Sequence, residues 1–99
     1  MCAVWVYSPN AIIGEALTTY VVSLGFRVCV DPERAAVAVF DLTSFDVLVP
    51  PPPPLPCLAM VRSPEPDLLE AVLRLGYRDV HPPSYDKVRF ARSLQALLA

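Results

Sequence analysis

The chain has 99 residues, of which 55% are hydrophobic and 18% charged, and its formal net charge at pH 7 is -2. A chain of this length buries one modest core, so we expect residues 1–99 to form a single domain. The acidic balance provides no basic footprint for a phosphate backbone, which excludes direct nucleic-acid binding by this domain. The start carries no positively charged region and the first long apolar segment contains Glu15, so the sequence predicts neither a signal peptide nor a membrane span.

Three cysteines, Cys2, Cys29 and Cys57, are odd in number and widely spaced. Because two of them fall inside apolar runs, we expect reduced, buried thiols in a cytoplasmic protein. The sequence has no C-x-x-C motif and its single histidine is His81. The residues therefore predict neither a metal site nor a bound cofactor.

The first 30 residues predict a strand, a helix and a second strand. An apolar strand over residues 3–7 leads to Asn10, whose side chain is suited to cap a helix over residues 11–24. Gly25 follows in the left-handed position that commonly ends a helix, and residues 27–30 predict the second strand. The apolar positions of the helix recur every three to four residues and predict the face that packs on a sheet: Ile12, Ile13, Ala16, Leu17, Tyr20, Val21 and Leu24.

The central element is a nearly unbroken apolar run over residues 36–42, with Asp41 near its end. Such a run, rich in β-branched and aromatic residues, is typical of a strand that is buried on both faces of a parallel sheet. Functional crevices of open α/β sheets lie at the carboxyl ends of the strands, so Asp41 is the first candidate for a functional side chain. Residues 31–35, which separate this strand from the preceding one, have room for at most one helical turn.

A proline-rich strap runs from Val47 to Pro56, with prolines at all five positions from 50 to 54. Consecutive prolines fix φ and donate no backbone hydrogen bond, which predicts polyproline II in place of a crossover helix. We expect the strap to cover the sheet face that lacks helices. A second protomer or a partner protein is the alternative cover, with Pro52 and Leu55 as candidate contacts, and binding of the strap to an aromatic groove is a further alternative.

The rest of the chain predicts two strands and two helices. In order, these are a strand over residues 57–61, a helix capped by Ser63 with Pro64 in its first position and ended by Gly76, a strand over residues 78–80, and a helix capped by Ser84. The side chains of the final helix that we expect to point inward are Phe90, Ala91, Leu94, Leu97 and Leu98. Arg89 and Arg92 are expected on its outer face.

The order of elements predicts the fold class. Alternating strands and helices with right-handed crossovers imply a parallel five-stranded sheet in the order 2-1-3-4-5. The expected fold is an α/β, flavodoxin-like three-layer sandwich in which helix 2 is reduced to a turn and helix 3 is replaced by the proline-rich strap.

These motifs resemble those of response-regulator receiver domains, the CheY-like family, and are closest to receivers of NarL/FixJ-type transcriptional regulators. Residues 39–42, Val-Phe-Asp-Leu, are similar to the family pattern that carries the phospho-accepting aspartate. Residues 71–80 resemble the family's A-x-x-x-G-A-x-x-Y/F-L segment, and His81-Pro82 stands where the family has Lys-Pro. The resemblance covers nearly the whole chain and implies the CheY-like fold, with a cis bond expected between His81 and Pro82.

The resemblance places Asp41 at the phospho-acceptor position. The chemistry of the family uses two acidic residues that hold Mg²⁺, a hydroxyl group and a lysine. This chain has Ser8 and Pro9 in place of the acids, Val61 in place of the hydroxyl residue and His81 in place of the lysine. Because phosphoryl transfer requires a metal ion and a cation to offset its charge, we expect Asp41 not to be phosphorylated.

The expected function is therefore that of an atypical, degenerate receiver that acts through protein–protein contact and is not an enzyme. The resemblance implies two-component signal transduction and transcription regulation, with this chain as the N-terminal domain of a bacterial regulator. The expected partners are a second copy in a homodimer, a fused DNA-binding domain or another regulatory protein, with Arg89 and Arg92 as candidate contacts. Two alternatives stay open: a phospho-switch at Asp41 with His81 in the lysine position, and a small-ligand sensor that uses the crevice at the strand ends.

Overall fold

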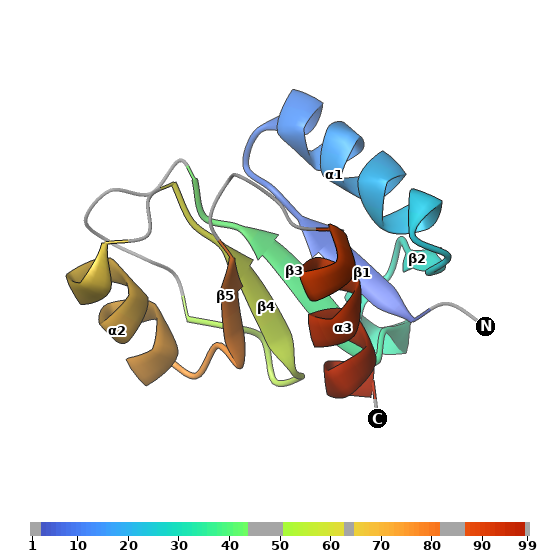
Figure 1. The fold of residues 1–99 in the computed structure, drawn as a ribbon. Helices are drawn as coiled ribbons and strands as arrows, with labels where there is room; N and C mark the ends of the chain where they lie inside the picture. The colour runs from blue at the N-terminus through green and yellow to red at the C-terminus, as the bar shows by residue number, and fades with distance from the viewer. Residues whose placement is uncertain (1–2, 44–50, 63–64, 82–86, 99) are drawn as a thin grey trace.

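The computed structural model describes residues 3–43, 51–62, 65–81 and 87–98. Its centre is a parallel five-stranded sheet in the order β2-β1-β3-β4-β5 (Figure 1). The elements are, in chain order, β1 (Val4–Tyr7), α1 (Ala11–Ser23), β2 (Val28–Cys29), the 3-10 turn η1 (Pro32–Arg34), β3 (Val37–Asp41), β4 (Cys57–Met60), α2 (Pro66–Arg74), β5 (Asp79–His81) and α3 (Lys87–Leu98). This topology confirms the predicted flavodoxin-like, CheY-like fold class.

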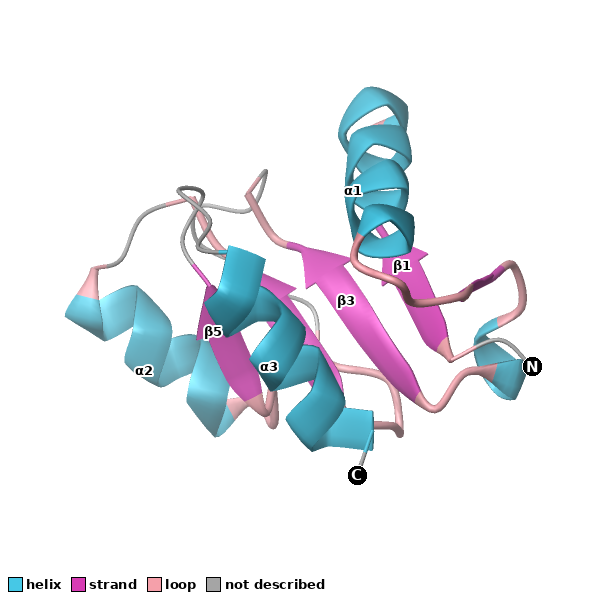
Figure 2. Ribbon diagram, turned by 45° about the vertical axis from the view of Figure 1, so that its right-hand side comes forward, coloured by secondary structure: helices cyan, strands magenta, loops and turns pink. Residues whose placement is uncertain are grey.

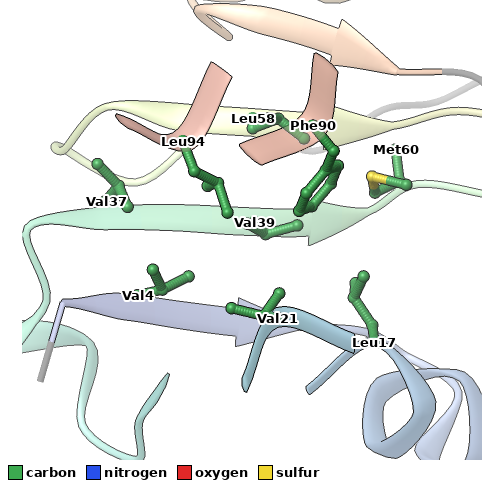
Figure 3. Close-up of a cluster of buried hydrophobic side chains, with 9 residues drawn as sticks. All are labelled: Val4, Leu17, Val21, Val37, Val39, Leu58, Met60, Phe90 and Leu94. Carbon is green, nitrogen blue, oxygen red and sulfur yellow. The ribbon is translucent and has the colours of Figure 1, made fainter. Parts of the chain in front are cut away.

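Helices α1 and α3 cover one face of the sheet, and α2 covers the other (Figure 2). Successive residues of a strand point to opposite faces, so β3 contributes to both cores. Val37 and Val39 pack toward α1 and α3, whereas Ala38 and Phe40 pack in the cluster that contains α2. The buried cluster of the first face, shown in Figure 3, consists of Val4, Leu17, Val21, Val37, Val39, Leu58, Met60, Phe90 and Leu94.

The second face carries one helix, one short turn and the strap. The single turn of η1 connects β2 and β3, as the short spacing between these strands predicts. Residues 51–56 of the strap contain neither helix nor strand, and residues 47–50 lie outside the described part of the chain. Leu55 packs against the buried cluster of this face, and the N–H of Ala38 donates to the C=O of Pro56 at 2.9 Å. Over residues 51–56, the prediction that a strap lies on the sheet in place of helix 3 is confirmed.

Aromatic side chains supply part of the packing on this second face. The ring centroid of Phe40 lies 5.4 Å from that of Trp5, 4.8 Å from that of Tyr7 and 6.1 Å from that of Tyr77. The Trp5 and Tyr77 rings meet Phe40 edge to face, a geometry that aromatic pairs prefer. These rings thus supply apolar contacts on the face of the sheet where η1 and the strap replace helices.

Glycines end α1 and α2, as the sequence predicts. Gly25 has φ +95° and Gly76 has φ +112°, in the left-handed region that L side chains rarely adopt. The N–H of Gly25 donates to Val22 at 3.0 Å and the N–H of Phe26 donates to Val21 at 3.4 Å. These two bonds define a Schellman motif, which satisfies carbonyls at the end of α1 and turns the chain into β2.

The start of α2 differs from the prediction. The N-cap is Glu65 and the helix begins at Pro66, so a start at Ser63 and Pro64 is wrong. The residue before a proline is driven out of the helical region, and Glu65 is accordingly extended, with φ -68° and ψ 130°. The second proline of the Ser-Pro-Glu-Pro sequence therefore determines where the helix begins.

Smaller differences concern the outer strands. β2 is shorter than predicted, and β5 lies one residue later, so that it includes His81. The predicted cap Ser84 and the peptide bond from His81 to Pro82 lie outside the described residues.

The two cysteines in the described part of the chain differ in state. Cys57, in β4, is a buried free thiol, and burial raises its pKa to about 12, so it stays protonated at neutral pH. Cys29 is disulfide-bonded. The expectation of reduced thiols is therefore correct for Cys57 and wrong for Cys29, because spacing along the chain does not reveal which cysteines meet in space.

Helix α1 packs with fewer residues than predicted. Leu17 and Val21 are buried against the sheet, whereas Ile12 is 80% exposed and Ile13 and Ala16 are also exposed. The 13 residues of α1 include a single charged residue, so apolar side chains lie on nearly all sides of the helix. The 3.6-residue period then does not select one face, and the prediction that Ile12, Ile13 and Ala16 face the sheet is wrong.

Candidate functional site

Asp41 lies at the carboxyl end of β3, where the sequence predicts it, and is 1% exposed. Its Oδ2 accepts a hydrogen bond from the Ser8 hydroxyl at 2.7 Å. Its Oδ1 accepts two bonds from Thr43, one from the backbone N–H at 3.0 Å and one from the hydroxyl at 2.5 Å. Both carboxylate oxygens are thus engaged by hydroxyl and amide donors.

Pairing between neighbouring strands brings Ser8 to Asp41. Tyr7 of β1 is in register with Phe40 of β3, so the next residue of each strand lies at the same edge of the sheet. The Ser8 oxygen also accepts a hydrogen bond from the N–H of Asn10 at 3.1 Å, which holds the loop between β1 and α1. Ser8 occupies a position that is acidic in the family. In this chain it therefore acts as a neutral donor to Asp41.

Asn10 joins this loop to the start of α1. Its side-chain oxygen accepts from the N–H groups of Ile12 at 3.0 Å and Ile13 at 3.2 Å, which confirms the predicted cap. A β-carbon on Gly14 would lie 3.3 Å from the β-carbon of Ser8. The absence of a side chain at Gly14 lets the first turn of α1 approach the Ser8 loop closely.

Thr43 is the residue of this site that the sequence analysis missed. An aspartate that accepts the backbone N–H two residues later forms an Asx turn, and such turns commonly follow a strand. The Asp-x-Thr spacing at the end of a predicted strand is the signal that identifies it.

His81 lies away from Asp41, and Val61 offers it no polar group. His81 is in register with Met60 of β4, which in turn is in register with Asp41, so one strand separates the two polar residues. The Nε2 atom of His81 lies 3.0 Å from the Ser93 hydroxyl of α3 and 3.5 Å from a carboxylate oxygen of Asp79. Val61 is buried in the cluster of the second face. The structure thus brings Ser8 to Asp41 and turns His81 toward α3.

Burial lowers the pKa of His81, which is 2% exposed. The Asp79 carboxylate acts in the opposite direction and raises this pKa, whereas the Arg89 guanidinium lowers it further. Desolvation by the surrounding sheet and helix is the largest of these influences. His81 is therefore predominantly neutral at pH 7 in the folded chain.

We expect acidification to destabilise the fold through His81. The unfolded histidine has a pKa of about 6.5, above that of the folded state, so the unfolded chain binds more protons as the pH falls below this value. The free energy of unfolding should then decrease as the pH is lowered from 8 toward 5.5. Urea unfolding at several pH values checks this, with His81→Gln as the comparison because the amide keeps a partner for Ser93. Equal pH slopes for the two proteins would contradict the expectation.

The candidate contact residues fall on opposite sides of the molecule. Arg89 and Arg92 lie on α3 beside a groove of about 380 Å³ between β5 and this helix. The residues that line the groove are Arg78, Asp79, Val88, Arg89, Arg92, Ser93, Ala96 and Leu97. Leu55 packs on the other face of the sheet, and Pro52 approaches Gly76 there at the end of α2. The four candidate contact residues, Arg89, Arg92, Pro52 and Leu55, therefore do not form one contact surface.

The described residues contain neither a metal-binding cluster nor a membrane-spanning helix. Among these residues, there is no group of three or more histidine, cysteine, aspartate or glutamate side chains that could hold a metal ion. None of the described helices is long and apolar enough to cross a membrane.

No protein-family model matches the chain, and no curated protein matches it. Several solved structures are similar in fold. A protein described as the pilus assembly protein CpaE of Burkholderia thailandensis is 18% identical, with a TM-score of 0.80 over 98% of each chain. A response regulator receiver protein from Burkholderia phymatum is 16% identical, with a TM-score of 0.72 over 99% of this chain and 95% of the other.

A response regulator CheY-like protein from Mesorhizobium loti is 14% identical, with a TM-score of 0.70 over 97% of this chain and 98% of the other. At such identities, the shared feature is the course of the backbone, which agrees with the strand order and the placement of the helices described above. The chain therefore has the fold of response-regulator receiver domains, the CheY-like fold.

Proposed function

We propose that the chain is a non-phosphorylated pseudo-receiver, which acts in the cytoplasm through protein–protein contact and has no enzymatic activity of its own. The observation that carries this proposal is the environment of Asp41. Its carboxylate is buried and accepts hydrogen bonds from Ser8 and Thr43. An acceptor of a phosphoryl group has to reach the donor molecule and needs cations nearby to offset the transferred charge. Hydroxyl and amide groups do not supply that charge.

The surface of α3 supports a role in contact with proteins. This helix carries Lys87, Arg89 and Arg92 and no acidic residue, although the chain as a whole has a net charge of -2. Val88 is 59% exposed between these cations. On the opposite side of β5, the first turn of α2 carries Asp67. We propose a homodimer in which the basic surface of α3 in one copy faces the acidic end of α2 in the other, because complementary charge orients protein association.

We propose that this module regulates a larger bacterial protein, as the N-terminal domain of a transcriptional regulator. The names of similar structures provide a second setting, since one of them is described as a pilus assembly protein. Both settings require the same physical property, which is a receiver fold that binds a protein surface without a phosphorylation step.

Incubation with acetyl phosphate and Mg²⁺, or with beryllofluoride, is expected to leave the intact mass of the protein unchanged. Asp41→Asn serves as the control for modification at this position. A stable adduct on the wild-type chain that is lost in Asp41→Asn would overturn the proposal and establish a phospho-switch at Asp41.

The proposed dimer is tested in the same preparation by light scattering over a concentration series. We expect the wild-type chain to dimerise and Arg92→Glu to weaken the dimer by reversing a charge on α3. Arg27→Glu, an identical change at an exposed position before β2, is expected to have little effect. A wild-type chain that stays monomeric at all concentrations would refute the homodimer.

A further inference from the structure

An open groove of about 490 Å³ lies on the second face of the sheet, between η1 and the strap. Its volume is in the range of sites that hold small organic ligands. The residues that line it are Trp5, Pro32, Glu33, Ala35, Pro53, Pro54 and Leu55. The groove is separate from the edge of the sheet where Asp41 accepts its hydrogen bonds, so it is a site of its own.

The aromatic residue that lines this groove, Trp5, is held in place by two neighbouring rings. Trp5 is half-buried, and its ring lies 6.0 Å from Tyr7 and 5.4 Å from Phe40 between centroids. Contacts with two other rings restrict the rotamers of the indole. Because a ligand then meets an indole that is already oriented, little conformational entropy is lost when it binds.

Proline residues make the two walls stiff. Pro32 stands on the side of η1, and Pro53 and Pro54 stand on the side of the strap. The pyrrolidine ring fixes φ in each of them, so the backbone of the walls has few alternative conformations. The strap is also tied to the sheet through the hydrogen bond from Ala38 to Pro56. The groove therefore exists before a ligand enters.

The charge of the lining selects the ligand. Among the residues that the structure describes along the groove, Glu33 is the one charged residue, and its side chain is exposed. The N–H of Glu33 donates to the Asp31 carboxylate at 3.0 Å, which holds the backbone of η1 in position. An indole beside a carboxylate favours a planar cation, because a guanidinium can stack on the ring while its N–H groups pair with both carboxylate oxygens.

We propose that this groove binds a guanidinium group, stacked on Trp5 and paired with Glu33, with the alkyl stem of the ligand along the proline walls. An ammonium group is a poorer match because it is compact and strongly hydrated and has no planar face. The same chemistry is present in small guanidinium compounds and in arginine side chains of polypeptides. This site neither requires nor excludes the contact function proposed above.

Trp5 is the single tryptophan of the chain, so its fluorescence reports directly on this groove. The probes are Nα-acetyl-arginine methylamide and the matching citrulline compound, which has the same shape and no charge. We expect a saturable change in fluorescence with the arginine probe and about tenfold weaker binding of the citrulline probe. Two-dimensional NMR should show shifts of the Trp5 indole N–H and of the backbone of residues 33–35.

Two matched variants test the role of the carboxylate. Glu33→Gln is expected to weaken binding of the arginine probe by about threefold, because it removes an exposed ion pair and keeps the shape of the side chain. Glu15→Gln makes the same change on α1, over the opposite face of the sheet, and should leave binding unchanged. Equal affinity for both probes, or no saturable change in fluorescence and NMR, would overturn the proposal.

The source of the guanidinium is distinguished by two further ligands. Agmatine provides the free group on an alkyl stem, and the capped tripeptide Gly-Arg-Gly provides it within a polypeptide. Tighter binding of agmatine would support the proposal with a small molecule as the ligand. Tighter binding of the tripeptide would support it with an arginine of a partner protein, since the flanking backbone then adds contacts along the strap.

Discussion

Replacing Phe90 by alanine is expected to lower the free energy of unfolding by about 3–5 kcal/mol. The ring is completely buried in the cluster between α3 and the sheet. Its centroid lies 5.3 Å from that of Tyr20 on α1 and 5.4 Å from that of His81 on β5, so it joins three elements of the first core. Truncation removes apolar contact area and leaves a cavity, and a packed sheet closes such a cavity only in part. Domains of this size unfold with a total of about 5–15 kcal/mol, so this loss is a large share of the stability.

Val88→Ala is the matched control for Phe90→Ala, because Val88 lies two residues earlier on the same helix and is 59% exposed. Its substitution should change the free energy of unfolding by about 0.5 kcal/mol or less. Urea denaturation followed by circular dichroism measures both variants. If the two curves have the same midpoint, α3 is not anchored to the sheet through Phe90.

Replacing Asp41 by alanine is expected to lower the free energy of unfolding by about 1–3 kcal/mol. The substitution removes the acceptor of three hydrogen bonds, one from the Ser8 hydroxyl and two from Thr43. These donors lie at a partly buried edge of the sheet, and without Asp41 they lose their common partner. The loop after β1 and the turn after β3 should both become less protected against amide hydrogen exchange, which supplies a second measurement.

Asp41→Asn removes the charge of the carboxylate but keeps groups that can form its hydrogen bonds. The amide oxygen can still accept from Thr43, and the Ser8 hydroxyl can rotate to accept from the amide nitrogen. We therefore expect Asp41→Asn to be more stable than Asp41→Ala. If alanine raises the stability, the hydrogen bonds of Asp41 do not compensate for the burial of its carboxylate, and a structural role for this residue is wrong.

Local sequence patterns predicted the elements and most of their ends. Asn10 was identified as a helix cap from its side chain alone, and Gly25 and Gly76 as helix ends from their position after apolar stripes. Such features depend on backbone geometry within a few residues, so the chain needs no distant partner to reveal them. The start of α2 was missed because two prolines stand close together there, and the constraint that Pro66 imposes on Glu65 decides between them.

The candidate site could be predicted only in part. The position of Asp41 at a strand end followed from the apolar run before it. Its bond to Ser8 depends on the pairing of β1 with β3, across 33 positions of the sequence. The orientation of His81 toward Ser93 depends on how β5 and α3 pack, and no local pattern specifies that packing.

Apolar runs, helix stripes and connection lengths predict the parallel α/β topology of this protein, because they restrict the chain to few arrangements. Consecutive prolines likewise predict a stiff strap in place of a helix, because they fix φ and donate no backbone hydrogen bond. Local patterns do not specify which side of α1 is buried or which donors contact Asp41, nor that Trp5, Glu33 and the strap line one groove. These features result from contacts between segments far apart in the chain, and contacts of that kind form only when the sheet brings the segments together.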